Sequence, residues 1–109
     1  MSETQFLHRV EQTLARIEAA LDDAGIDADC SRSGYVLTIE LENGAQIVVN
    51  AQAPTRQIWL ASRSSGAMHF DAEGDRWIDR RSGAELFESL SRVVTALSGT
   101  ETHLLGSEM

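Results

Sequence analysis

Residues 35–42, YVLTIELE, alternate between apolar and polar side chains, and this alternation limits the fold more than any other feature of the chain. A period of two is typical of a β-strand with one buried and one exposed face. The Asn43-Gly44 pair follows, and it favours a two-residue hairpin turn in which both residues adopt positive φ. The return strand is AQIVVNA at 45–51. We therefore predict a hairpin whose apolar face needs a second layer to cover it.

An amphipathic helix is predicted on each side of the strands, over residues 3–24 and 83–98, because apolar side chains recur there every three or four positions. Each helix starts at a capping box and ends at a glycine. These end residues are Ser2 with Gln5 and Gly25 for the first helix, and Ser82 with Glu85 and Gly99 for the second.

Three more short β runs lie between the hairpin and the second helix, at 57–62, 67–72 and 75–79. The order helix, about five antiparallel strands, helix predicts an α+β fold. We expect a two-layer α-β sandwich in which both terminal helices pack on one face of the sheet and the other face is open to water. Residues 1–99 form a single domain in this prediction, and 100–109 form a flexible tail.

The net charge of −8 argues against binding to nucleic acid or to anionic lipid, because both would repel the chain. Metal ions and basic protein surfaces remain as partners. The first ten residues do not resemble a signal peptide, and no apolar run is long enough to cross a membrane. Cys30 is the only cysteine, so an internal disulfide is impossible. We expect a soluble, cytoplasmic monomer.

Acidic side chains gather along one edge of the first predicted helix and in the loop after it. Glu18 and Asp22 are one helical turn apart, so both could bind one hard cation. Asp22 and Asp23 lie near the helix C-terminus, where the helix dipole disfavours negative charge. Two interpretations stay open, a solvated acidic face and a series of shallow metal sites. The candidate ligands are Glu11, Glu18, Asp22, Asp23, Asp27 and Asp29, and Glu40 and Glu42 could extend the row.

The open face of the sheet is the second candidate surface. If Ile58 and Leu60 face the helices, Trp59 points to solvent, where tryptophan is typical of a protein interface. The alternative is a shifted register that buries Trp59. Trp77 is expected in the core against the second helix. The sequence contains no zinc-ligand spacing, phosphate loop or nucleophile motif, so no catalytic residue is predicted.

The pattern NAQAPTRQIWLAS at 50–62, with Trp77 and RSG at 81–83, resembles the frataxin family, and most closely its bacterial, CyaY-type members. The likeness extends from LDD at 21–23 to the second helix. It implies the same sandwich fold, and weak binding of ferrous or ferric iron on an acidic ridge formed by the first helix and first strand. It also implies binding to the cysteine desulfurase and the iron–sulfur scaffold protein.

The resemblance assigns roles to individual residues. Ridge acids of bacterial members match Glu11, Glu18, Asp22 and Asp23, whereas Ala19 stands where another acid is common. The patch that contributes to partner contacts matches Asn50, Gln52, Gln57 and Trp59, and His69 stands where eukaryotic members have a basic residue. The expected function is therefore an iron-binding protein that modulates, or supplies iron to, iron–sulfur cluster assembly. An acidic adaptor without a metal role and a weak ferroxidase stay open as alternatives.

Overall fold

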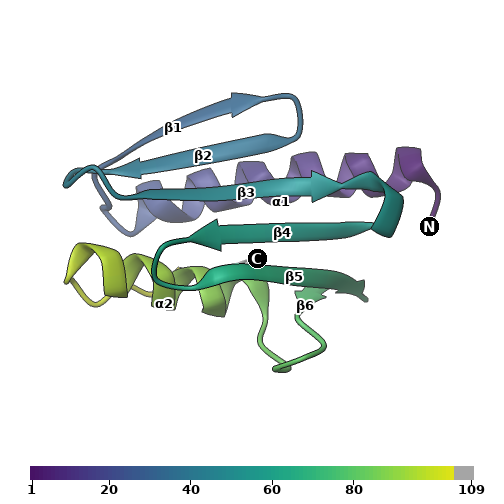
Figure 1. Ribbon diagram of the computed structural model, residues 1–109. Coiled ribbons are helices and arrows are strands. Elements are labelled where there is room, and N and C mark those ends of the chain that lie inside the picture. Colours follow the sequence, from purple (N-terminus) through teal and green to yellow (C-terminus); the bar gives the residue numbers. More distant parts are fainter. Residues whose placement is uncertain (105–109) are drawn as a thin grey trace.

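The computed structural model describes residues 1–104, in which two α-helices pack on one face of a six-stranded antiparallel sheet (Figure 1). The strands lie in the sheet in the order of the sequence, from β1 at one edge to β6 at the other. The elements are α1 Glu3–Asp23, β1 Ala28–Ser33, β2 Val36–Leu41, β3 Gln46–Gln52, the 3-10 helix η1 Ala53–Thr55, β4 Gln57–Ser62, β5 Gly66–Glu73, β6 Arg76–Ile78 and α2 Leu86–Ser98. The predicted α+β sandwich is confirmed.

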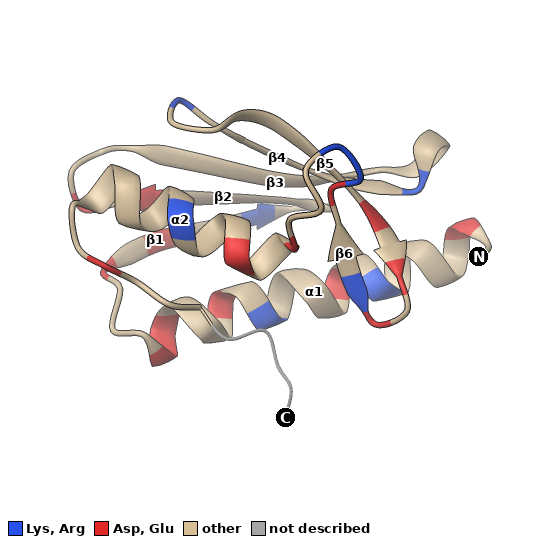
Figure 2. Cartoon of the chain, turned by 90° about the horizontal axis from the view of Figure 1, so that it is seen from below, with Lys and Arg blue, Asp and Glu red and all other residues tan. Residues whose placement is uncertain are grey.

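The core lies between the helices and the inner face of the sheet, and both helices lie on the same side of it (Figure 2). The predicted apolar stripe of α1 is buried along its whole length, and alternate residues of the central strands meet it. The buried residues of these elements include Phe6, Val10, Leu14, Ile17 and Leu21 from α1, Leu37, Ile39, Ile47, Val49, Ile58 and Leu60 from the sheet, and Leu86, Leu90, Val94 and Leu97 from α2. One sheet face is thereby closed and the other is left to solvent.

Strand β1 is the main difference from the predicted sheet, which had about five strands. It has the sequence ADCSRS, and only its first residue is partly buried. An edge strand with exposed side chains needs no hydrophobic alternation, because backbone pairing with β2 is its main contact with the rest of the fold. Tyr35, the first residue of the alternating run 35–42, lies outside the strand, since it belongs to the turn between β1 and β2 and is 37% exposed.

The turn between β2 and β3 also differs from the predicted two-residue type. Asn43 keeps a negative φ and only Gly44, at 89°, is positive. The loop is longer because the side chain of Asn43 is used elsewhere. Its Oδ1 accepts a hydrogen bond from Ala45 N at 3.0 Å, and its Nδ2 donates to the carbonyl of Leu97 on α2 at 2.8 Å. Asn43 thus joins the hairpin to the second helix.

Helix α2 begins at Leu86, three residues later than predicted, and the capping box from Ser82 was wrong. Glu85 is the N-cap instead, and its carboxylate accepts bonds from two first-turn amides at 3.0 and 3.1 Å. Ser82 accepts a bond from Ala84 N at 3.2 Å within the preceding turn. The predicted stop at Gly99 is confirmed, with φ at 77°.

The segment after α2 packs against this helix, although we expected a flexible tail over 100–109. Leu104 is 5% exposed, and its backbone N–H donates to Ser91 Oγ at 2.8 Å. Thr102 is also buried, and its N–H donates to Thr95 Oγ1 at 2.9 Å. The remainder of the predicted tail, 105–109, lies outside the described residues.

Trp77 on β6 lies in the core as predicted, but its polar and aromatic partners come from α1 rather than α2. Its Nε1 donates a hydrogen bond to Thr13 Oγ1 at 3.0 Å, and its ring meets Phe6 edge to face at 6.0 Å between centroids. The guanidinium of Arg9 lies 5.0 Å from the ring centroid. This cluster fixes α1 to the far edge of the sheet.

Replacing Thr13 with valine tests this contact. The substitution keeps the volume but leaves the buried Trp77 N–H without an acceptor, so the free energy of unfolding should fall by about 1–3 kcal/mol. The matched control is Thr38→Val on the open face of β2, where the side chain is half-buried and its hydroxyl has no hydrogen-bond partner among residues 1–104. Urea unfolding of both variants measures the difference. Equal losses of stability would show that the Thr13–Trp77 bond contributes nothing specific.

Candidate functional site

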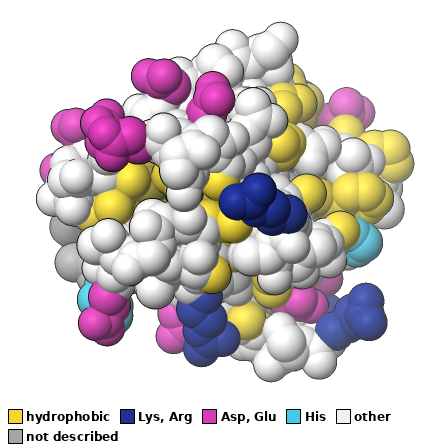
Figure 3. All heavy atoms as spheres, turned by 60° about the vertical axis from the view of Figure 1, so that its left-hand side comes forward, with side chains coloured by type: hydrophobic (Ala, Val, Ile, Leu, Met, Phe, Trp, Pro, Cys, Tyr) yellow, Lys and Arg dark blue, Asp and Glu magenta, His cyan; other side chains and the backbone are white. Residues whose placement is uncertain are grey.

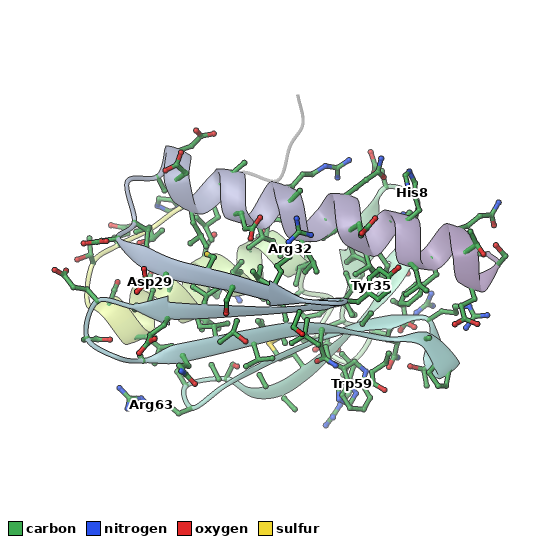
Figure 4. All side chains as sticks on the ribbon, turned by 90° about the horizontal axis from the view of Figure 1, so that it is seen from above. His8, Asp29, Arg32, Tyr35, Trp59 and Arg63 are labelled. Carbon is green, nitrogen blue, oxygen red and sulfur yellow. The ribbon has the colours of Figure 1, made fainter. Side chains whose placement is uncertain are left out.

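The acidic row of α1 lies beside β1, at the edge of the helical layer. Arg32 of β1 points toward α1 (Figure 4), and its Nε lies 3.6 Å from Glu18 Oε2. Both side chains are about one-third exposed, which makes this a partly screened ion pair. The central acid of the predicted row is therefore already bound by a base of the same chain. Glu11, about two turns earlier on α1 than Glu18, is exposed.

The acids at the end of α1 remain unbalanced. Asp22 and Asp23 are exposed, the last turn of α1 contains no basic residue, and no ion pair within residues 1–104 includes either of them. The C-terminal end of a helix carries partial negative charge, so both carboxylates lie where the dipole disfavours them. This part of the prediction, a local electrostatic cost with no basic partner, agrees with the structure.

Asp27 lies in the loop just before β1 and Asp29 lies within β1, so neither is on the helix. Asp29 is directly opposite Glu40 in the pairing of β1 with β2, so two like charges are cross-strand neighbours on the open face. In the space-filling view, acidic side chains gather at the end of the molecule where α1 ends and β1 begins (Figure 3). We call Asp22, Asp23, Asp27, Asp29 and Glu40 the acidic corner.

The six predicted metal ligands do not converge on one point. Within residues 1–104, no group of three or more His, Cys, Asp or Glu side chains is arranged to hold a metal ion. Carboxylate oxygens nevertheless suit hard cations such as iron or magnesium, with water completing the coordination. The acidic corner can therefore attract cations to shallow positions, but it is not a preformed cage.

The predicted partner-binding residues do lie together, on the open face of the sheet. Asn50 is opposite Trp59, and Gln52 is opposite Gln57, in the pairing of β3 with β4. Ile58, which lies between Gln57 and Trp59 in β4, is buried. Trp59 therefore points away from the helices, as expected (Figure 4). Its indole Nε1 donates to Gln57 Oε1 at 2.9 Å, which holds the ring in one orientation.

Two residues of β5 complete this surface. The family resemblance already associates His69 with it, whereas nothing in the sequence indicated Asp71. The ring of His69 stacks on Trp59, with centroids 4.1 Å apart and planes at 16°. Asp71 accepts a hydrogen bond from Gln57 Nε2 at 3.3 Å, and Arg80 Nε lies 3.2 Å from its other oxygen. The register of Asp71 opposite Gln57 was the signal that could have identified it. We call Asn50, Gln52, Gln57, Trp59, His69 and Asp71 the Trp59 patch.

Cys30 does not supply a reactive thiol. Desolvation by burial raises the pKa of its thiol above the ordinary value, and the nearby carboxylates of Glu18 and Asp29 raise this pKa further. The thiol is therefore protonated at neutral pH, and the protonated form is a poor nucleophile and a poor metal ligand.

Residues 1–100 match the family described as the frataxin-like domain. The iron-sulfur cluster assembly protein CyaY of Janthinobacterium sp. (strain Marseille) is 47% identical over 104 residues, which cover 91% of this chain and 92% of that protein. The protein of the same name from Herminiimonas arsenicoxydans is 43% identical over 109 residues, covering 95% and 96%. Within residues 1–104, no helix is both long enough and apolar enough to span a membrane.

Solved structures agree with this match. Frataxin from Psychromonas ingrahamii has a TM-score of 0.87 at 32% identity, covering 94% of this chain and 97% of that one. Trimeric frataxin from Saccharomyces cerevisiae, in a structure described as complexed with ferrous, has a TM-score of 0.60 at 31% identity, covering 88% and 84%.

Neutralising the two aspartates at the end of α1 should stabilise the protein. In Asp22→Asn with Asp23→Asn, each lost charge should raise the free energy of unfolding by about 0.3–1 kcal/mol, because the helix dipole no longer opposes it. The matched control is Glu3→Gln in the first turn, where a negative charge is favourable and its loss should be destabilising. Urea unfolding at low and high salt measures both effects, which salt should reduce. A double variant less stable than the unmodified chain would contradict this electrostatic account.

Proposed function

The chain belongs to the frataxin family, and on that premise we propose that it acts in iron–sulfur cluster assembly as an iron-binding regulator or iron donor. The relatives named as assembly proteins match it over nearly their whole length. The observation that carries the proposal is the acidic corner, where Asp22 and Asp23 lie at a helix end with no basic partner among the described residues. We propose that the chain acts in the cytoplasm and that it is not an enzyme.

Iron is the proposed cargo of the acidic corner. Oxygen ligands suit both ferrous and ferric ions, and the carboxylates of Asp22, Asp23 and Asp27 are all exposed to solvent. A bound cation would relieve the repulsion that these charges exert on one another. Glu18 can take part only if it leaves Arg32, which costs part of the binding energy. We therefore expect weak binding at several surface positions, and Glu11 is a peripheral ligand at most.

The proposed partners are the cysteine desulfurase and the iron–sulfur scaffold protein. Two features of one sheet face support this. Asp29 and Glu40 carry negative charge on β1 and β2, and Trp59 with His69 forms a stacked aromatic surface on β4 and β5. Tryptophan held in a fixed orientation is a typical anchor of protein interfaces, and negative charge beside it favours a basic partner surface.

An acidic adaptor without a metal role is the second candidate. It is favoured by the ion pair between Arg32 and Glu18, and by the absence of a converging ligand group within residues 1–104. The same absence gives a ferroxidase no support, because oxidation of paired iron ions in proteins uses carboxylates that converge on both metals.

Titration with ferrous iron under anaerobic conditions distinguishes these candidates. The melting temperature of the unmodified chain should rise with iron, because a ligand that binds only the folded state stabilises it. Amide NMR signals should broaden over 18–29. Asp22→Asn with Asp23→Asn should remove most of both effects, whereas Glu88→Gln on α2 should leave them unchanged.

Two results would count against the iron-binding proposal. One is a melting temperature that does not respond to iron in the unmodified chain. The other is broadening centred on His69 or His103 instead of the acidic corner, since it would place the metal on imidazole nitrogen.

A further inference from the structure

The outer edge of β1 is an unpaired sheet edge. β1 is the first strand of the sheet order, and within residues 1–104 no other strand lies on its outer side (Figure 1). It pairs with β2 in continuous register from Ala28–Leu41 to Ser33–Val36, so it contains no bulge. Its sequence, ADCSRS, contains neither proline nor lysine. The edge therefore has no proline, lysine or bulge to prevent a further strand from pairing, and its charged residues are Asp29 and Arg32.

The hydrogen bonds of β2 show which groups of β1 face outward. The N–H of Leu41 donates to the carbonyl of Ala45, and the N–H of Ala51 donates to the carbonyl of Tyr35. Odd-numbered residues of β2 therefore bond toward β3. In an antiparallel sheet the direction alternates with each residue, so even-numbered residues of β2 bond toward β1. Their partners in the register are Asp29, Ser31 and Ser33.

The remaining residues of β1 therefore present their backbone N–H and C=O groups to the outside. These residues are Ala28, Cys30 and Arg32. Their side chains lie on the α1 side of the sheet, since they are opposite the buried Leu41, Ile39 and Leu37. The free edge thus offers three donors and three acceptors at the spacing of an additional strand.

The charge around this edge selects the kind of strand that fits. The start of β1 lies in the acidic corner, and Glu18 flanks the strand from α1. Arg32 is the one base on β1, and it is paired with Glu18. A second copy of the chain would bring its own acidic corner to this edge, and each copy carries a net charge of −8. Charge complementarity therefore favours a basic occupant.

We propose that β1 binds an extended, basic segment of a partner protein, which pairs with its outer edge as an additional strand of the sheet. Backbone hydrogen bonds to Ala28, Cys30 and Arg32 supply the pairing, and the acidic corner selects for lysine or arginine side chains. This surface is separate from the Trp59 patch. Strand pairing at this edge does not require iron, so it can be tested independently of the proposed iron binding.

The test uses the full chain and a blocked synthetic peptide of about eight residues in which lysine and valine alternate. Cys30→Pro removes one outward N–H and leaves the ladder with β2 intact, because the N–H of residue 30 does not bond β2. Cys30→Ala is the matched control that keeps this N–H. We expect binding to Cys30→Pro to be about tenfold weaker than binding to Cys30→Ala, measured by calorimetry at low salt.

Hydrogen exchange gives a second, residue-specific readout on the unmodified chain. In the free protein the amides of Asp29 and Ser31 should exchange slowly and those of Cys30 and Arg32 quickly, since only the first two bond β2. The peptide should slow exchange at Cys30 and Arg32. A peptide of the same charge that is N-methylated at every residue should bind about tenfold more weakly, which keeps the test informative if Cys30→Pro does not fold.

Three outcomes would overturn the proposal. The first is equal binding of the methylated and unmethylated peptides, which would show attraction to the acidic corner without strand pairing. The second is peptide binding that leaves the exchange of Cys30 and Arg32 unchanged, or no binding at all. The third is self-association of the chain in sedimentation that Cys30→Pro abolishes, which would make a second copy the occupant. None of these outcomes bears on whether ferrous iron raises the melting temperature.

Discussion

The burial of α1 against the sheet determines where every other surface of this protein lies. Phe6, Leu14 and Ile17 are fully buried against alternate residues of the central strands. Because side chains in a strand alternate between faces, closing one face commits the intervening residues to the other. Trp59, which is half-buried, lies on the open face for this reason, and the polar edge of α1 comes to lie beside β1. Removing large side chains from this contact would leave cavities of a kind that usually cost several kcal/mol.

The packing of α1 on the sheet brings several negative charges close together at one end of the molecule. The acidic corner combines a helix C-terminus, a loop and the first two strands, and it carries charges that repel one another. One base, Arg32, compensates Glu18, while Asp22 and Asp23 have no such partner among the described residues. A region of this kind favours any positive guest, whether a metal ion, a basic protein surface or a basic strand. Guests that use the same carboxylates would compete, so binding of one would weaken binding of another.

The sequence predicts the elements with strong periodicity and misses the features that depend on contacts between distant residues. The apolar stripe of α1 and the alternation of 35–42 identify the sandwich, because burial of one face imposes a visible period. β1 carries no such period, so its pairing with β2 was invisible. The ion pair of Arg32 with Glu18 was missed for the same reason, since it exists only if β1 is a strand beside α1.

Local rules failed where a distant group competed for a side chain. Asn43 suits a tight turn, but it also reaches the carbonyl of Leu97, more than fifty residues away, and the loop adopts a longer form. The stacking of His69 on Trp59 depends on the register of β4 with β5, which single-strand patterns do not specify. The candidate surfaces could thus be located by strand and face, whereas their internal contacts required the three-dimensional structure.

The central claim is that the acidic corner is kept electrically unfavourable so that a positive guest can bind there. The most direct measurement is the affinity of the chain for the cysteine desulfurase across a titration with ferrous iron. If iron and a basic partner surface use the same carboxylates, the affinity should fall as iron binds, and the decrease should be lost when Asp22 and Asp23 are changed to asparagine. An affinity that stays constant while iron demonstrably binds the acidic corner would contradict the claim.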